Sequence, residues 1–320
     1  MNFTLYNGDC LVELKKLEDN SVDSCVTDPP YGLSFMGNQW DYEVPSADIW
    51  REVLRVLKPG AHLLAFFGSR TYHRGAIAIE DAGFEIRDQI MWIYGTGFPK
   101  AGNLKPAHEP IVVARKPFSG TRKGNVEKYG TGDLNIDDCR LEEGAKKWEK
   151  PRGGIWKTDK NAKADLIDNP LGRYPANVIH GGDCFGDNSK FFYCAKASKS
   201  DRDEGMEQFL AKKIVTFQTG GGASGKPSSI SAGRNTEYKN SHPTVKPTEL
   251  MKYLVKLVTP QGGIVLDPFM GSGSTGKACG FEGYKFIGIE RDPDYYEIAE
   301  ARIEHAYRKE TISLEDFFTD

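Results

Sequence analysis

The pattern of apolar and polar positions predicts alternating strands and helices in the first part of the chain. Two apolar runs, 21–28 and 61–68, have the length of buried strands. Between them, over 46–57, apolar residues recur at every fourth position, and a Lys-Pro-Gly sequence follows that would end a helix. A strand, a helix and a second strand in this order indicate a βαβ unit, in which the strands are parallel.

The last third of the chain repeats this alternation. The predicted elements there are a helix that begins at Thr248, a strand over 263–267, a helix over 274–281, a strand over 284–290 and a helix from Pro293 to about Arg308. Thr248 and Asp292 are the expected N-caps of the first and the last of these helices. The two ends of the chain together predict one α/β fold.

The middle of the chain, from about residue 117 to 240, has a different composition. It shows weak periodicity and contains a Gly/Ser-rich segment, 219–233, and we expect the whole region to be partly disordered in the absence of its ligand. Residues 100–250 hold 26 Lys and Arg against 19 Asp and Glu, a net charge of +7, while the rest of the chain holds 16 against 26, a net charge of −10. A basic middle in an acidic frame indicates a region that faces phosphates; a solvated surface elaboration is the alternative.

A first candidate motif, Asp28-Pro29-Pro30-Tyr31, directly follows the first predicted strand. The carboxylate can accept a hydrogen bond from an amino N–H, the prolines can hold carbonyl acceptors in place, and the tyrosine offers a flat face for a base. An aromatic amino group is a weak nucleophile because its lone pair is conjugated with the ring. Acceptors on both N–H groups favour the pyramidal form, whose lone pair is free to attack. The structural alternative is a double-proline turn with a capping aspartate.

A second candidate motif is a glycine-rich turn between a predicted strand and a predicted helix. It begins at Asp267 and contains Phe269, Gly271 and Gly273, and Glu290 ends the next strand. Glycines in such a turn let the backbone approach a nucleotide closely, and a carboxylate at the next strand end commonly binds ribose hydroxyls. The turn lacks the Gly-Lys-Ser/Thr of a phosphate-binding loop and the third glycine of the dinucleotide fingerprint. We therefore expect a nucleoside ligand without phosphates.

Two shorter motifs complete a pattern. Asn7-Gly8-Asp9-Cys10 lies near the N-terminus, and His242-Pro243-Thr244-Val245-Lys246-Pro247 lies just ahead of the strand that leads to the glycine-rich turn. With these, the chain resembles the permuted β-class of DNA amino-methyltransferases, in which a DPPY motif precedes an FxGxG cofactor motif and a target-recognition region separates them. The matches cover roughly residues 2–115 and 240–307. Each motif is short, but four in this order are very specific.

The resemblance implies an α/β fold with a Rossmann-like class I methyltransferase sheet, mostly parallel and with seven strands. It divides the chain into a catalytic half (1–116), a long inserted target-recognition region (117–240) and a cofactor-binding half (241–320). The implied cofactor is S-adenosyl-L-methionine. No metal is expected, because the sulfonium is already an activated leaving group.

The resemblance also implies the roles of individual residues. The catalytic residues would be Asp28, Pro29, Pro30 and Tyr31, and the cofactor pocket would be lined by Asp9, Thr244, Lys246, Asp267, Phe269, Gly271, Gly273 and Glu290. Asp9 would lie near the adenine of the cofactor. Thr244 and Lys246 would lie near its methionine end, where the Lys246 ammonium can meet the carboxylate. A surface lysine is the alternative for Lys246.

The insert is long for this family. Its RYPANV sequence (173–178) and its KFFYCAKASKSDR sequence (190–202) resemble methyltransferases of phage and prophage origin. We expect residues 191–193 to form a buried strand. Lys196, Lys199 and Arg202 in the second sequence are the expected contacts to DNA phosphates.

The expected target is N6 of an adenine in double-stranded DNA, flipped out of the duplex. An aspartate at the first position of the DPPY motif favours adenine, whereas a serine would favour cytosine. Cytosine N4 is the main alternative, because it carries the same kind of amino group. Methyltransferases of RNA guanine or protein glutamine use a similar tetrapeptide, but there the glycine motif comes first. A catalytically silent DNA-binding module does not account for the intact DPPY motif.

The remaining features limit the cellular setting. No apolar run approaches the ~20 residues of a membrane span, and the N-terminus does not have the pattern of a signal peptide. The chain has 6 cysteines, which are scattered and form no CxxC pair. We therefore expect a cytoplasmic protein without membrane or zinc. The resemblance also allows a homodimer and a restriction endonuclease as partners.

Overall fold

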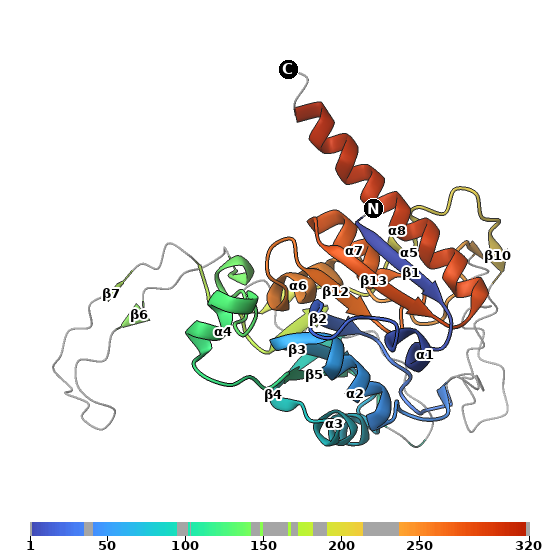
Figure 1. The fold of residues 1–320 in the computed structure, drawn as a ribbon. Helices are drawn as coiled ribbons and strands as arrows, with labels where there is room; N and C mark the ends of the chain where they lie inside the picture. The colour runs from blue at the N-terminus through green and yellow to red at the C-terminus, as the bar shows by residue number, and fades with distance from the viewer. Residues whose placement is uncertain are drawn as a thin grey trace.

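The computed structural model describes residues 2–34, 41–94, 102, 104–141, 148–149, 166–167, 172–181, 191–213 and 237–317. Within them the chain forms a layered α/β fold around a long sheet (Figure 1). The first elements are β1 (Phe3–Asn7), α1 (Cys10–Leu14), β2 (Val22–Thr27), α2 (Ala47–Val56), β3 (Leu57–Phe66), α3 (Tyr72–Asp81), β4 (Glu85–Tyr94) and β5 (His108–Arg115). In the middle follow α4 (Arg122–Tyr129), η3 (Asp137–Cys139), β6 (Trp148–Glu149), β7 (Leu166–Ile167), β8 (Val178–Gly181), β9 (Phe192–Tyr193), α5 (Lys199–Asp203), β10 (Lys212–Lys213) and β11 (Glu237–Tyr238). The last are α6 (Thr248–Val258), β12 (Ile264–Asp267), α7 (Ser274–Glu282), β13 (Lys285–Glu290) and α8 (Pro293–Phe317).

In the described part of the chain, 9 strands form one sheet in the order β1-β13-β12-β2-β3-β5-β4-β8-β9. Neighbouring strands in it are parallel, except that β5 runs antiparallel to both β3 and β4. The predicted α/β class with a mostly parallel sheet is confirmed. The expected number of seven strands is too low, because β8 and β9 of the insert extend the sheet beyond β4.

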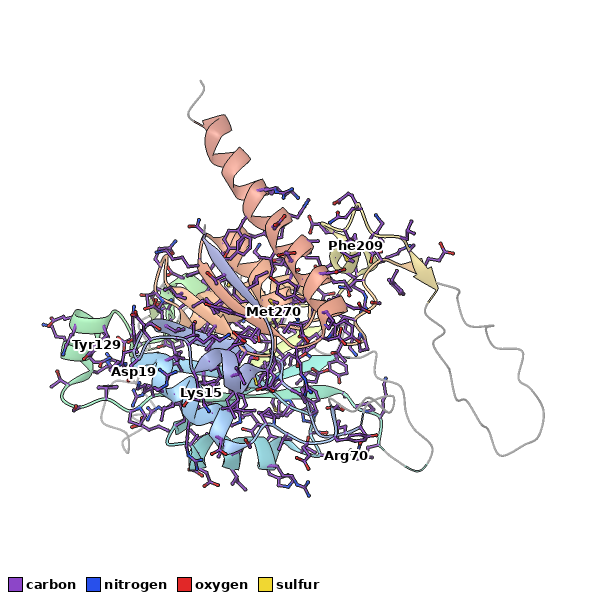
Figure 2. The ribbon with its side chains drawn as sticks, turned by 45° about the vertical axis from the view of Figure 1, so that its right-hand side comes forward. Lys15, Asp19, Arg70, Tyr129, Phe209 and Met270 are labelled. Carbon is purple, nitrogen blue, oxygen red and sulfur yellow. The ribbon has the colours of Figure 1, made fainter. Side chains whose placement is uncertain are left out.

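Helices cover both faces of this sheet, which explains the continuous apolar runs in the sequence. Successive side chains of a strand point to opposite faces. Val26 and Leu64 therefore pack with α6, α7 and α8, whereas Cys25 and Leu63 pack with α1, α2 and α3. Figure 2 shows Met270, which belongs to the first of these cores, in the middle of the molecule. Strands that are buried on both faces carry apolar residues at every position, so their sequences do not alternate.

The edge of the sheet at the carboxyl ends of its parallel strands brings the two main motifs together. The chain runs from β2 to β3 in one direction across the sheet and from β12 to β13 in the other. The order therefore reverses between β12 and β2, which pair in parallel. Open α/β sheets bind their ligands at such a point. The DPPY motif follows β2 and the glycine-rich turn follows β12, so Asp28 and Asp267 flank this position.

Several element ends differ from the predicted ones. The strand after α2 begins at Leu57, because the Lys-Pro-Gly sequence forms part of β3. The N-cap of α6 is Pro247, and the side chain of Thr248 instead bonds Asp201. Asp292 is confirmed as the cap of α8, since its carboxylate accepts hydrogen bonds of 2.9 and 3.2 Å from the first turn.

The insert is described only in part, and Lys190 and the Gly/Ser-rich segment 219–233 lie outside the described residues. The strand predicted at 191–193 is present as β9. Its predicted burial is wrong for Tyr193, which is 59% exposed, because β9 is the last strand of the sheet. Of the helices that the structure describes, none is long and apolar enough to cross a membrane.

Candidate active site

A cavity of about 1810 Å³ lies at the sheet edge where the two motifs meet. All four residues of the DPPY motif line it, as do the predicted cofactor residues with the exception of Gly273. Gly273 precedes α7 with a φ of +77°, and a Cβ atom there would lie 3.0 Å from the Cα of Ala299 in α8. This glycine therefore permits the close packing of two helices. The predicted catalytic and cofactor residues otherwise share one cavity.

Asp267 is buried at the base of the glycine-rich turn. One of its oxygens accepts hydrogen bonds from the Thr27 hydroxyl (2.6 Å) and the Phe269 backbone N–H (3.1 Å), and the other from the Thr275 hydroxyl (2.6 Å). Burial raises the pKa of Asp267 to about 6. Thr27 is the last residue of β2. Asp267 thus shapes the turn and ties it to the strand that carries the DPPY motif.

Glu290 ends β13 and faces the same turn. Its carboxylate accepts hydrogen bonds from the backbone N–H groups of Gly271 (2.7 Å) and Asp292 (2.8 Å). Burial raises the pKa of Glu290 to about 7. Each carboxylate oxygen has a second lone pair, so Glu290 can still accept bonds from the hydroxyls of a ligand.

Asp9 lies next to Glu290 because of the strand pairing. β1 pairs with β13, with Asn7 opposite Glu290. The Asp9 carboxylate caps α1 by accepting hydrogen bonds from the backbone N–H groups of Leu11 (3.0 Å) and Val12 (3.3 Å). Two carboxylates therefore border the cavity at this end of the sheet.

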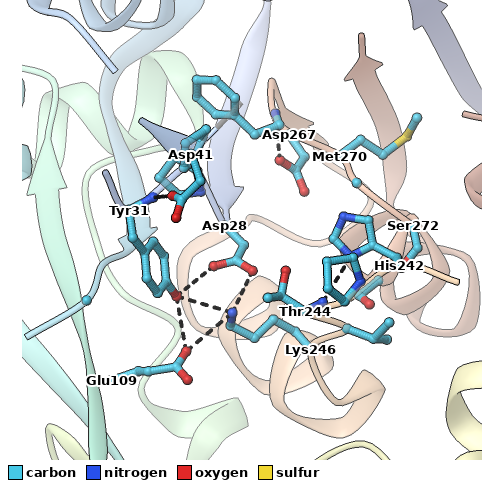
Figure 3. A pocket seen from close by; sticks show the side chains of 18 of the residues that line it. Asp28, Tyr31, Asp41, Glu109, His242, Thr244, Lys246, Asp267, Met270 and Ser272 are labelled. Atoms are coloured by element: carbon cyan, nitrogen blue, oxygen red, sulfur yellow. Dashed lines mark hydrogen bonds and ion pairs between the residues drawn. The ribbon is translucent and has the colours of Figure 1, made fainter. Parts of the chain in front are cut away.

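At the other end of the cavity, Asp28 belongs to a cluster of four polar side chains (Figure 3). Its carboxylate accepts hydrogen bonds from the Tyr31 hydroxyl (2.8 Å) and the Lys246 ammonium (2.5 Å). Glu109 contacts the same two groups, at 3.1 Å from the Tyr31 hydroxyl and 3.3 Å from the Lys246 nitrogen. Asp28 and Glu109 thus share one phenol and one ammonium group.

The cluster is electrostatically coupled. Burial raises the pKa of Asp28, the charge of Lys246 lowers it and the charge of Glu109 raises it, and the net result is a raised pKa. Burial lowers the pKa of Lys246, but the charges of Asp28 and Glu109 outweigh this effect and raise it. Burial and the two neighbouring carboxylates raise the pKa of Tyr31. The cluster therefore holds a neutral phenol, a charged ammonium group and two acids.

Asp41 fixes the backbone that follows the DPPY motif. Its buried carboxylate accepts hydrogen bonds from the backbone N–H groups of Tyr31 (2.6 Å), Gly32 (3.0 Å) and Leu33 (3.3 Å). This role was not predicted, because Asp41 belongs to no motif. Tyr31 is therefore fixed at two points. Asp41 bonds its backbone N–H, and Asp28 and Glu109 bond its hydroxyl.

The HPTVKP element lines the cavity with its residues 242–246. The backbone N–H of Thr244 donates to the His242 ring (3.3 Å), and this ring meets that of Tyr295 edge to face with centroids 4.5 Å apart. Burial lowers the pKa of His242 to about 3, so its imidazole is neutral. The Lys246 ammonium is held by Asp28 and Glu109. Its contact with a cofactor carboxylate stays a prediction.

The three predicted DNA contacts differ in their positions. Lys196 is exposed at the cavity, with its ammonium 3.8 Å from the centroid of the Tyr94 ring. Lys199 is exposed at the start of α5. Arg202 is half-buried and donates a hydrogen bond of 2.6 Å to the His242 carbonyl. Lys196 and Lys199 are therefore accessible to phosphates, whereas Arg202 joins α5 to the HPTVKP element.

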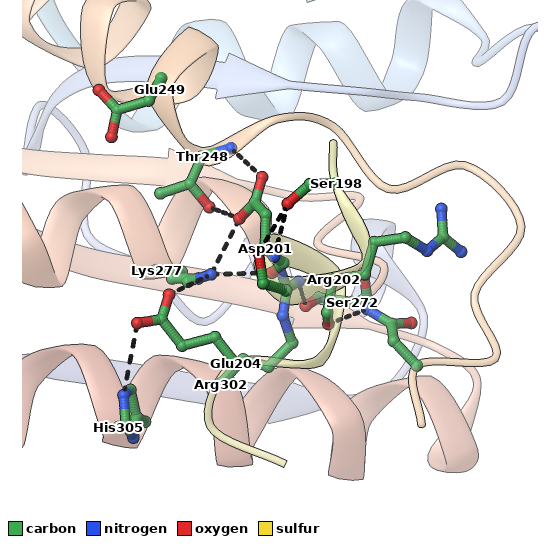
Figure 4. Close-up of polar contacts among 12 residues, drawn as sticks. Ser198, Asp201, Arg202, Glu204, Thr248, Glu249, Ser272, Lys277, Arg302 and His305 are labelled. Atoms are coloured by element: carbon green, nitrogen blue, oxygen red, sulfur yellow. Dashed lines mark hydrogen bonds and ion pairs between the residues drawn. The ribbon is translucent and has the colours of Figure 1, made fainter. Parts of the chain in front are cut away.

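A buried polar network anchors α5 to the cofactor half of the chain (Figure 4). Lys277 in α7 is fully buried and forms ion pairs of 3.0 Å with Asp201 and with Glu204. Arg302 in α8, also fully buried, donates to the carbonyls of Asp201 and of Ser272 in the glycine-rich turn. The segment that carries the predicted DNA contacts is thus bonded directly to the predicted cofactor turn.

Comparisons with known proteins show the family to which the chain belongs. A family model for DNA methylases of the N6/N4 type matches residues 22–301. The chain belongs to the DNA methylase family. It is an S-adenosyl-L-methionine-dependent DNA methyltransferase, so the predicted cofactor and reaction class are confirmed.

Two curated relatives match nearly the whole chain. The type II methyltransferase M.HindIII of Haemophilus influenzae is 24% identical over 342 residues, which cover 93% of this chain and 94% of that protein. The type II methyltransferase M.HpaI of Haemophilus parainfluenzae is 24% identical over 315 residues, or 96% and 76% of the two chains. Among solved structures, the PvuII DNA methyltransferase (cytosine-N4-specific) is similar in fold, with a TM-score of 0.55, 17% identity, and coverage of 97% of this methylase and 92% of that chain.

Proposed function

We propose that this DNA methylase methylates N6 of adenine in double-stranded DNA. The observation that carries the proposal is the position of Asp28. A carboxylate, where a serine would favour cytosine, lies in the same cavity as Glu290 and the glycine-rich turn. The amino group of a base held at Asp28 would face the predicted cofactor residues. Cytosine N4 is the alternative target, because the same site would accept its amino group.

The side chains of the cavity fit S-adenosyl-L-methionine in their chemistry. Glu290 and Asp9 offer carboxylate acceptors to ribose hydroxyls and to the adenine amino group. Phe269 lines the cavity and offers an apolar contact. Thr244 and Lys246 are polar groups for the methionine end, and Lys246 would leave one of its two acids to reach a carboxylate. When bound, the cofactor supplies a methyl group activated by a sulfonium.

The DPPY motif prepares the target nitrogen for attack. The Asp28 carboxylate and a backbone carbonyl of the double proline accept the two amino N–H groups, which frees the nitrogen lone pair. Tyr31 lies beside the base, held in place by Asp28 and Glu109. After transfer the nitrogen carries a surplus proton, and the Asp28 carboxylate, which already accepts a bond from that nitrogen, is positioned to take it.

We further propose that residues 117–240 carry DNA recognition, with Lys196 and Lys199 contacting phosphates. The exposure of both lysines, the position of Lys196 at the cavity and the net positive charge of residues 100–250 support this proposal. The order of the motifs supports membership of the permuted β-class. The type II names of both relatives support a restriction endonuclease as partner.

The test is to incubate the purified chain with duplex DNA and labelled S-adenosyl-L-methionine and to identify the methylated nucleosides by mass spectrometry. The expected product is N6-methyldeoxyadenosine. The variant Asp28→Asn is the inactive control, and RNA and protein substrates test the alternative acceptors. N4-methyldeoxycytidine as the only product would refute the adenine assignment.

A further inference from the structure

Glu109 lies in the active site although it belongs to none of the motifs. It is the second residue of β5, the antiparallel strand, so the amino end of β5 meets the carboxyl ends of the parallel strands. Its side chain is 19% exposed and contacts the Tyr31 hydroxyl and the Lys246 ammonium. The Tyr94 hydroxyl, at the carboxyl end of β4, also bonds to it. Glu109 is therefore fixed from three sides beside Asp28.

The charges of the cluster indicate that a second acid is needed to offset the positive charge of Lys246. Asp28 and Lys246 form a 2.5 Å ion pair, whose charges cancel. Methylation of a neutral amino group leaves a positive charge on the nitrogen. A neutral pair would stabilise this charge only weakly, and the Lys246 ammonium on its own would oppose it. With both acids ionised, the three side chains would carry a net charge of −1, which favours the charge that develops on the nitrogen.

We propose that Glu109 is a functional carboxylate of the methyltransferase site, which compensates Lys246 and thereby leaves Asp28 a net negative charge at the target amino group. This inference rests on the proposed role of Asp28 and holds for adenine or cytosine as target. Glu109 acts through its neighbours, so it is a positioning residue. Lys246 would remain paired with Glu109 when Asp28 turns to the base.

Other titratable groups face the cluster from the neighbouring elements. They are Tyr31 and Asp41 after β2, Tyr94 on β4, Lys196 before α5, His242 in the HPTVKP element and Asp267 after β12. Lys196 is a further cation near the cluster, and its charge interacts with those of Glu109 and Lys246. Its side chain is more exposed than that of the buried Lys246, so water screens its charge more.

The first experiment compares Glu109→Gln with the parent enzyme in methyl transfer to duplex DNA at saturating cofactor. We expect kcat to fall by ~10²-fold and KM for DNA to change little, because the charge acts on the transition state. The matched control is Glu85→Gln. Glu85 also forms an ion pair with β5, with Arg115 at the far end of that strand, and its removal should leave kcat unchanged. A kcat near that of the parent in Glu109→Gln would overturn the proposal.

The pH profile separates a charge effect from simple support of Tyr31. Transfer requires ionised Asp28, and the charge of Glu109 raises the pKa of Asp28. Without that charge Lys246 dominates, so the acid limb of kcat should move to lower pH in Glu109→Gln. Glu109→Asp keeps the charge and should recover much of the activity. If Glu109→Asp is folded but as slow as Glu109→Gln, or if the acid limb does not move, the compensating role is wrong.

A double variant tests the pairing directly. If Glu109 compensates Lys246, then Glu109→Gln combined with Lys246→Met should lose less activity than the product of the two single losses. Losses that multiply would contradict the proposal. The parent enzyme reports on the proposed function separately, since its methylated product identifies the target base whatever the variants do.

Discussion

If Glu290 binds the ribose as proposed, its raised pKa should make cofactor binding depend on pH. Ribose hydroxyls would donate to the ionised carboxylate, which is the form present above a pKa of about 7. The affinity for S-adenosyl-L-methionine should therefore be constant at higher pH and should fall as the pH drops through this value. Below this pKa the affinity can decrease by about tenfold per pH unit. The reason is that the Glu290 carboxyl group must release its proton before it can bind the ribose as a carboxylate.

Glu290→Gln removes this charge and nearly preserves the shape of the side chain. The loss of a charge-assisted hydrogen bond should weaken binding by roughly 1.5–3 kcal/mol, or about 10- to 150-fold in Kd, at a pH above the pKa. Below the pKa the difference should shrink, because the parent carboxyl is then neutral as well. Two binding curves that converge at low pH are the expected signature.

The assay is calorimetric titration with S-adenosyl-L-methionine at several pH values between about 6 and 8, the range around an acid raised to neutrality. Glu297→Gln, an exposed acid in the first turns of α8, is the matched control and should follow the parent. If Glu290→Gln binds the cofactor as tightly as the parent at high pH, Glu290 is not a cofactor ligand. If both proteins keep the same pH dependence, another group causes it.

Further substitutions test the other parts of the site. Asp28→Asn should lower kcat by ~10²-fold or more with little change in the Kd for the cofactor, and near-normal turnover would refute its catalytic role. Replacing Lys196 and Lys199 by alanine should weaken DNA binding and flatten its salt dependence by up to about 0.9 per phosphate contact in the log–log slope, so an unchanged slope excludes both contacts. Arg202→Ala should lower the free energy of unfolding by about 1–3 kcal/mol in denaturant titrations, whereas a change in DNA affinity alone would contradict its anchoring role. Lys277→Met, which leaves two acids without their buried cation, should lower the same quantity by about 3–5 kcal/mol, and a stability equal to that of the parent would be inconsistent with the network.

The central strands were predictable because burial on both faces requires a continuous run of apolar residues in the sequence. The strands 21–28 and 284–290 are found within one residue of their predicted ends as β2 and β13. The two strands added by the insert were not predictable as part of this sheet. β8 has only four residues and lies about eighty residues after its partner β4, so no local pattern indicates the pairing.

The candidate site was predictable where its residues follow one another in the chain. Asp28 and Tyr31 are in one turn, and Gly271 is part of one strand-to-helix connection, so each group could be recognised from a short sequence motif. Glu109 escaped prediction because the usual rule looks at the carboxyl ends of parallel strands, and Glu109 lies at the amino end of an antiparallel one. The position of Lys246 between two acids likewise depends on the sheet order and not on its own motif.

Ionisation of the buried acids in the cavity lowers the stability of the native state, because burial raises their pKa values. The pKa of Glu290 is about 7 against an ordinary value of 4.5, so the native state binds more protons than the unfolded state between these values. The free energy of unfolding therefore falls as the pH rises through this range. Above the native pKa the loss amounts to about 3 kcal/mol. Asp267, with a pKa of about 6, acts in the same direction. A ligand that donates hydrogen bonds to Glu290 relieves this cost, so the gain in stability on cofactor binding should increase with pH over the same range.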